Sequence, residues 1–123
     1  MTVDIRLHPG QGYLVVEAGG PYDRATAAAA IMQIRAECAR LKLDRVLVDA
    51  RGLDATVSIA DRFELARALA EGCTATVRFA ILVHPNQMVT KTLEDTATNR
   101  GVPVQTTASP EEAYGFLGIA PPD

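Results

Sequence analysis

The stretch RVLVDARGL, which runs from Arg45 to Leu53, decides how the rest of this 123-residue sequence is interpreted. Its unbroken apolar run is typical of a parallel strand that is buried on both faces. The run breaks at Asp49, at Arg51 and at a glycine, and loops at such strand ends are where α/β domains place functional groups. We therefore predict an inner strand over residues 46–49, followed by a loop over residues 51–57.

A second stretch, VRFAILVHPN, repeats this arrangement from Val77 onward. Its apolar residues end in His84, Pro85 and Asn86, which predicts a second inner strand over residues 77–84. Because parallel strands carry their carboxyl ends to the same edge of a sheet, the polar residues of both stretches are expected to point toward one edge.

The sequence before these strands predicts an antiparallel hairpin and a long helix. Apolar and polar residues alternate over 3–8 as on a strand at a sheet edge, and turn residues over 9–12 lead to a returning strand over 13–18 that a Gly-Gly-Pro run ends. From 22 to 42, apolar residues recur at steps of three and four, which is helical spacing. These positions are Ala27, Ile31, Ile34, Cys38 and Leu41.

A second helix is predicted to begin at Ser58. The serine and Asp61 fit a capping pattern, in which the serine oxygen accepts a backbone N–H group of the first helical turn. A core stripe should follow on this helix, which Gly72 ends, and its expected members are Ile59, Phe63, Ala66 and Leu69. A more polar third helix is predicted over Gln87–Arg100.

The last elements are a short strand over 102–106 and a final helix. Proline at the second position of that strand places it at a sheet edge, where a missing N–H group costs nothing. Ser109, Pro110 and Glu112 form the clearest cap in the chain, ahead of a helix with Ala113, Phe116 and Leu117 as its apolar residues. The order ββαβαβαβα predicts an α/β fold with a mixed, mostly parallel sheet and helices packed on it.

Length and composition exclude several classes of protein. At 123 residues we expect a single domain over 1–123. The net charge of -3 argues against nucleic acid as a partner, and no apolar run approaches the roughly 18 residues that span a bilayer. The start of the chain lacks the features of an export signal, so we expect a cytoplasmic protein. Cys38 and Cys73 lack metal or redox spacing and are interpreted as small fillers.

Motifs for catalysis are missing from the sequence. No glycine-rich nucleotide loop and no G-x-S-x-G elbow occurs, and His8 and His84 have no ligand or triad partner at a useful spacing. We therefore predict no enzyme activity, no metal and no cofactor. Asp49 and Arg51 could orient a ligand or pair with each other, and the favoured interpretation of both is a solvated or structural loop charge. A phosphoacceptor receiver would also keep an aspartate at the position of Asp49, but the acids and the lysine that such a site needs are missing.

The runs VLVDARGL, ADRFELARAL, RFAILV, NRGVPVQ and SPEEAYGFL together resemble the SpoIIAA-like proteins of the STAS group, named for sulphate transporters and anti-sigma-factor antagonists. The resemblance covers nearly the whole chain. It implies a small regulatory domain that docks a partner protein through the loop and helix start after the third strand. In antagonists of this family a serine at that helix start is phosphorylated by a partner kinase. Ser58 falls nearest that place and Thr56 lies two residues before it, so that Ser58, Thr56, Asp49, Arg51 and Asp61 are the expected partner-binding or switch residues.

The sequence departs from the family at this turn. The antagonists carry a run of the Asp-Ser-Ser-Gly type, whereas this chain has Val57, Ser58, Ile59 and Ala60. We therefore favour a helix cap as the role of Ser58. The phosphoserine alternative stays open, and so does the question of a homodimer.

A second function is also compatible with the resemblance, because relatives with this layout can hold lipids between a helix and the sheet. The alanine-rich segment 25–30 could leave room for a small apolar ligand, although alanines more often allow close packing. An interior cavity of several hundred cubic ångströms would favour such a ligand. An exposed apolar patch around residues 55–62 would favour protein docking.

Overall fold

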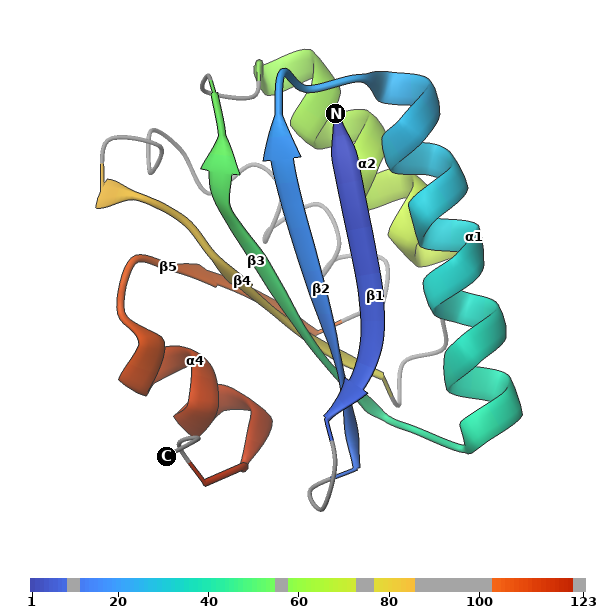
Figure 1. Cartoon of the computed structure of the whole chain (residues 1–123), viewed down its shortest axis with the longest axis vertical. Coiled ribbons are helices and arrows are strands. Elements are labelled where there is room, and N and C mark those ends of the chain that lie inside the picture. The colour runs from blue at the N-terminus through green and yellow to red at the C-terminus, as the bar shows by residue number, and fades with distance from the viewer. Residues whose placement is uncertain (9–11, 55–57, 73–76, 86–102, 121–123) are drawn as a thin grey trace.

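The computed structural model describes residues 1–8, 12–54, 58–72, 77–85 and 103–120. A twisted sheet forms its middle layer, with α1 and α2 on one face and α4 on the other (Figure 1). The elements are β1 (Thr2–His8), β2 (Tyr13–Gly20), α1 (Arg24–Leu41), β3 (Arg45–Leu53), α2 (Ile59–Gly72), β4 (Arg78–Leu82), β5 (Val104–Thr107) and α4 (Pro110–Leu117). The helix predicted over Gln87–Arg100, Asn86 and Cys73 lie outside the described residues.

The sheet has five strands in the order β1-β2-β3-β4-β5. The first pair is antiparallel and the other pairs are parallel. This confirms the predicted mixed sheet that begins with a hairpin, and it confirms that β1 and β5 are edge strands. The two inner strands predicted from the sequence, β3 and β4, lie side by side.

The face of the sheet that carries α1 and α2 holds the larger core. Val16, Val46 and Phe79 of the strands pack there against buried residues of both helices. In α1 these are the residues that its spacing predicts, except that Leu41 is only partly buried and Ala30 is buried as well. The helix is capped by the Asp23 carboxylate, which accepts from the Thr26 N–H group at 2.9 Å. It ends at Lys42, which has a left-handed backbone with φ of 55°.

The opposite face is covered in part by α4. Tyr13, Val15, Leu47 and Ala80 of the sheet are buried there with Ala113 and Leu117 of the helix. The predicted cap is present, because the Ser109 hydroxyl accepts from the Glu112 N–H group at 3.3 Å. The Glu112 carboxylate accepts from the Thr107 hydroxyl at 2.6 Å, and that hydroxyl in turn accepts from the Ser109 N–H group at 3.0 Å. A threonine thus connects the two halves of the capping box.

Strand β3 is longer than predicted. It continues to Leu53, so Asp49 and Arg51 lie within the strand and not at its end or in a loop. The reason is that β2 also continues, to Gly20, and the ladder between the two strands closes with the Asp54 N–H group donating to the Gly20 carbonyl at 3.0 Å. The glycines that suggested strand ends instead pair with each other, Gly19 opposite Gly52.

The extension of β3 contains a β-bulge. Glu17 pairs with Asp49 and Gly19 pairs with Gly52, so that two residues of β3 oppose the single Ala18 of β2. Gly52 has a steric reason to be glycine, because a Cβ atom there would lie 3.0 Å from the Ala18 carbonyl oxygen. Gly52 therefore marks a close approach of β2 and β3, and not the end of a strand.

Candidate docking site at the start of α2

Helix α2 begins at a serine cap, as the sequence predicts. The Ser58 hydroxyl accepts from the Asp61 N–H group at 3.1 Å, and the Ser58 carbonyl accepts from the Arg62 N–H group at 2.9 Å. Ser58 itself is exposed. The serine therefore satisfies an orphan donor of the first turn while it remains accessible from outside.

An ion pair joins the starts of α1 and α2. Arg24 donates from Nε at 3.0 Å and from Nη2 at 2.6 Å to the same Asp61 oxygen. This arginine, and secondly the Ser58 hydroxyl, hold the pKa of the Asp61 carboxyl below its usual value. Asp61 therefore stays ionised at neutral pH. Asp61 and Arg24 together place an ion pair beside Ser58.

The apolar residues of the first turns of α2 are not in the core, contrary to the stripe predicted from the sequence. Ile59 is 59% exposed and Phe63 is 42% exposed, whereas Ala66 and Leu69 are buried as predicted. The physical reason is that α2 turns a different stripe to the sheet: Arg62, Leu65, Ala66 and Leu69. Residues at 62, 65, 66 and 69 follow the helical period, and Ile59 and Phe63 fall at its margin.

These exposed residues and the cap form one surface on the first turns of α2. We call Ser58, Ile59 and Phe63 the α2 surface. It combines two large apolar side chains with a hydroxyl, next to the ionised Asp61. Thr56, the other predicted switch residue, lies outside the described residues.

The second group of predicted site residues consists of Asp49 and Arg51. It lies on the other face of the sheet, where Arg51 is close enough to Tyr114 of α4 for the two side chains to interact electrostatically. The Asp49 carboxylate accepts from the Arg51 N–H group at 3.1 Å, from its Nε at 3.0 Å and from its Nη2 at 2.9 Å. Hydrogen bonding to Arg51 holds the pKa of Asp49 below its usual value, with a smaller contribution from His84. The two residues thus pair with each other, which was one of the possibilities that the sequence left open, but they do so within a strand and not in a loop. The carboxylate also supports the bulged backbone.

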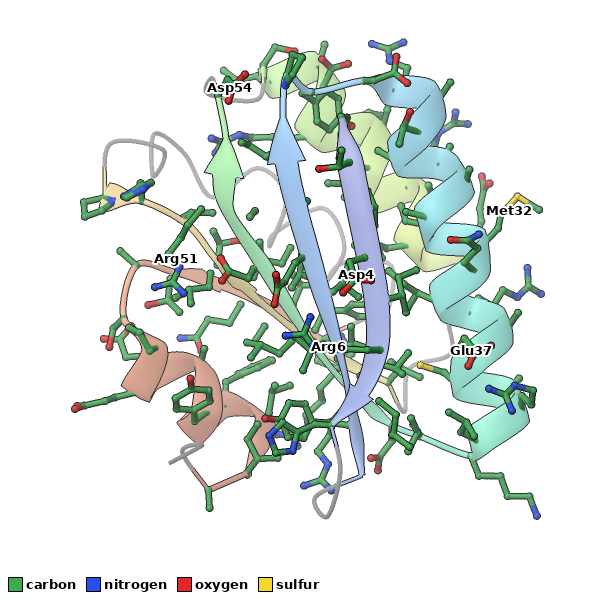
Figure 2. All side chains as sticks on the ribbon, viewed as in Figure 1. Asp4, Arg6, Met32, Glu37, Arg51 and Asp54 are labelled. Carbon is green, nitrogen blue, oxygen red and sulfur yellow. The ribbon has the colours of Figure 1, made fainter. Side chains whose placement is uncertain are left out.

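A polar patch continues from this pair across the sheet to β1. Arg6 donates to Asp4 at 2.9 Å and to Glu17 at 2.5 Å, and both Asp4 and Arg6 lie on the face of the sheet that carries α4 (Figure 2). Every carboxylate in this patch has an arginine partner, so its charges are already compensated. Surface ion pairs of this kind add little to stability, because water and salt screen them, and they are typical of a solvated sheet face.

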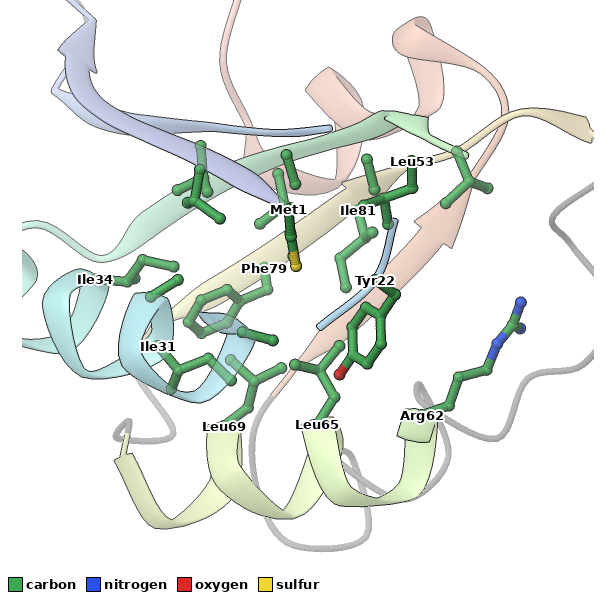
Figure 3. Close-up of a pocket in the computed structure, with 18 of the residues that line it drawn as sticks. Met1, Tyr22, Ile31, Ile34, Leu53, Arg62, Leu65, Leu69, Phe79 and Ile81 are labelled. Carbon is green, nitrogen blue, oxygen red and sulfur yellow. The ribbon is translucent and has the colours of Figure 1, made fainter. Parts of the chain in front are cut away.

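An apolar cavity of about 130 Å³ lies between the sheet, α1 and α2 (Figure 3). Its walls include Ile31 of α1, Leu65 and Leu69 of α2 and Phe79 of β4. The cavity borders the alanine-rich segment of α1, where close packing was favoured over room for a ligand. Its volume is well below the several hundred cubic ångströms that would favour an apolar-ligand carrier.

The described part of the chain has no group of three or more His, Cys, Asp or Glu residues that could hold a metal ion. Within the same residues, none of the helices combines the length and the apolar character needed to cross a membrane.

These elements define a mixed α/β domain whose sheet opens with a hairpin and carries helices on both faces. No protein-family model matches the chain, and no curated protein does. Among solved structures, the chain is similar to the crystal structure of an anti-sigma factor antagonist from Mycobacterium paratuberculosis, with a TM-score of 0.61 over 95% of this chain and 93% of that chain. The two sequences are 16% identical. The chain therefore has the fold of that antagonist, which is the fold that its resemblance to the SpoIIAA-like proteins implies.

The structure brings Ser58 and Asp61 together at the start of α2 and Asp49 and Arg51 together on β3. Sequence reasoning missed Arg24, which lies 37 residues from its partner Asp61. It also assigned Ile59 and Phe63 to the core. The sequence partly indicated the correct stripe, because Leu65 and Leu69 also lie at helical spacing. That stripe includes Arg62, however, and an arginine is not expected to be buried.

Proposed function

We propose that this chain is a non-enzymatic regulatory module of the anti-sigma-factor-antagonist type, which binds an anti-sigma factor through the α2 surface. The observation that carries the proposal is the exposure of Ile59 and Phe63 beside the Ser58 cap. Large apolar side chains that are grouped and exposed mark protein interaction sites more often than chance. The similarity in fold to an anti-sigma factor antagonist supports the choice of partner.

The chemistry around the α2 surface supports docking in preference to a reaction. The polar groups near it are already engaged, because Ser58 caps the helix and Asp61 binds Arg24. Apolar anchors with a charged margin are the usual composition of a small protein interface. The serine lies where a phosphate would add nearly two negative charges to that interface, next to the charge of Asp61.

The lipid-carrier alternative has less support. The cavity beside α1 has a volume of about 130 Å³, whereas sites for drug-sized ligands typically occupy about 300–1,000 Å³. A lipid chain does not fit that volume without a large rearrangement of α1 or α2.

The proposal is tested by capturing partners from an extract of the native host and then titrating the purified anti-sigma factor against the chain. Ile59→Ser and Phe63→Ser should each weaken binding by about tenfold or more, because anchor residues dominate interface energies. Met32→Ser is the matched control, since Met32 is 71% exposed on the outer side of α1 (Figure 2). If no anti-sigma factor binds, or if the Met32 variant weakens binding as much as the α2 variants, the proposal is wrong.

A second pair of variants distinguishes the two possible roles of Ser58, as a helix cap and as a site of phosphorylation. Asp and Asn both cap helices well, so Ser58→Asp and Ser58→Asn should both preserve α2. Only the aspartate adds a charge to the α2 surface. Loss of binding in Ser58→Asp alone would support a phosphorylation switch, and equal binding by both variants would leave Ser58 with only its capping role.

A further inference from the structure

The cavity between the sheet and the two helices is built as an apolar site with a rim. All but three of its lining residues are apolar, the exceptions being Tyr22, Arg62 and Thr106. Its floor is fully buried and includes Val16, Ile31 and Phe79, while Met1, Tyr22 and Leu53 are partly exposed and form the rim. Figure 3 shows apolar side chains of α1, α2 and the sheet converging on this space.

The space results from small residues on α1. Ala27 and Ala30 are buried at 5% and 8% exposure and both line the cavity, one turn before the larger Ile31 and Ile34. Leu65 and Leu69 face them from α2. Alanines on a helix usually allow it to pack closely against its neighbours. Here a cavity remains between α1, α2 and the strands.

The volume and lining define what such a void can bind. Cavities of about 150 Å³ that are lined by Leu, Ile and Phe stay dry and accept benzene or xenon. The present cavity, at about 130 Å³, is close to that size. Charged or strongly polar groups would lose their hydration on entry and find almost no hydrogen-bond partner inside, so the cavity excludes them.

We infer that this cavity is a binding site for one small, uncharged, apolar molecule of about the size of a benzene ring. The apolar body of the ligand contacts Ile31, Leu65 and Phe79, and a single hydroxyl substituent is tolerated only at the rim, where the Tyr22 phenol lies.

Two features of the rim agree with this ligand class. Burial raises the pKa of the Tyr22 phenol, so the group is a neutral hydrogen-bond donor and acceptor at physiological pH. Arg62 is 9% exposed, and Figure 3 shows its guanidinium directed away from the apolar side chains of the cavity. Its aliphatic stem contributes to the wall while its charge stays outside.

The site also lies directly beneath the proposed docking helix. Arg62 and Leu65 line the cavity from the same turns of α2 that expose Ile59 and Phe63. A bound molecule would therefore stabilise these turns from below. This effect on docking depends on the proposed function, whereas the binding of the small molecule does not.

The inference is tested with benzene and with xenon on the wild-type chain. Methyl NMR signals of Ile31, Leu65 and Leu69 should shift saturably, and benzene at about ten times its dissociation constant should raise the melting temperature by roughly 5 °C. Ala30→Leu fills the cavity and should abolish both effects. The matched control is Ala36→Leu, the same change at an exposed position of α1, which should retain them.

Several results would overturn the inference that the cavity binds a small apolar molecule. Absence of saturable shifts in the wild type, shifts at other residues, or unchanged benzene binding by a folded Ala30→Leu chain would each overturn the inference. Decanoate serves as a size limit, and tighter binding of decanoate than of benzene would also contradict it. If Ala30→Leu does not fold, the map of shifted wild-type methyl groups alone decides. None of these results depends on whether an anti-sigma factor binds.

Discussion

Gly52 shows at the scale of one residue how the sheet limits substitution. A Cβ atom at this position would lie 3.0 Å from the Ala18 carbonyl oxygen and 3.3 Å from the Gly19 Cα atom. Both neighbours are backbone atoms of β2, so neither can rotate away as a flexible side chain would. The glycine therefore allows β2 and β3 to stay paired beyond the bulge.

Gly52→Ala is expected to lower the free energy of unfolding by about 1–3 kcal/mol, because β3 must move away from β2 to admit the methyl group. Gly115→Ala is the matched control in α4, where a Cβ atom meets nothing within 4 Å. There alanine should stabilise the helix by about 0.5–1 kcal/mol. Urea unfolding followed by circular dichroism measures both, and equal effects of the two substitutions would contradict this role of Gly52.

Asp49 and Arg51 give a second prediction at the residue scale, on pH. The pKa of Asp49 is lowered in the folded chain, chiefly by hydrogen bonds from the Arg51 side chain. The carboxylate therefore contributes stability that is complete above its ordinary pKa of about 4 and is lost as the pH falls through the lowered value. Asp49→Ala should cost about 1 kcal/mol at pH 7, and the difference from wild type should shrink as the pH falls below about 4.

Arg51→Met provides the companion measurement. It removes the largest cause of the lowered pKa, so it should weaken the same pH dependence while the carboxylate is still present. Unfolding free energies of the wild type and both variants, measured from pH 7 to pH 2, test the pair. A wild-type advantage over Asp49→Ala that stays constant over this range would exclude the ion pair as its source.

At the scale of an element, α2 separates residues that hold the fold from residues that are available to a partner. Ala66 and Leu69 are 0% and 4% exposed, while Ile59 and Phe63 lie outside the core. Apolar residues on both sides of this boundary follow helical spacing, so the periodicity alone does not decide which of them face the sheet. In the structure the buried stripe includes Arg62, which leaves Ile59 and Phe63 exposed. A buried arginine is not predictable from hydrophobicity.

This boundary predicts two different costs of substitution. Leu69→Ala should lower the free energy of unfolding by about 2–5 kcal/mol, as expected for a large residue removed from a core. Ile59→Ala should cost less than about 1 kcal/mol, because the side chain is largely in solvent already. Thermal and urea unfolding of the two variants provide the comparison. If Ile59→Ala lowered the free energy of unfolding about as much as Leu69→Ala, Ile59 would belong to the core, as predicted from the sequence.

Other elements were predictable to the extent that local signals determine them. The caps at Ser58 and Ser109 were found from the sequence because each depends on residues within one helical turn. The length of β3 was not, because its last residues are in a strand only through their pairing with β2. Contacts between distant parts of the chain, such as Arg24 with Asp61, leave no local trace in the sequence.

At the scale of the whole molecule, the two faces of the sheet differ in what they can do. One face carries α1 and α2, a cavity and the α2 surface. The other carries α4 and a patch of arginines and carboxylates that are paired with one another. The hairpin, the edge strands and the two inner strands were predictable from alternation and unbroken apolar runs. The difference between the two faces was not predictable, since it depends on which side chains remain exposed after packing.

The most direct test is amide hydrogen exchange of the chain alone and in complex with the anti-sigma factor that we propose as its partner. We expect slower exchange over residues 58–67, which form the first turns of α2, and unchanged exchange around Arg6 and Arg51 on the opposite face. Slower exchange on that opposite face, with none over residues 58–67, would contradict docking through the α2 surface.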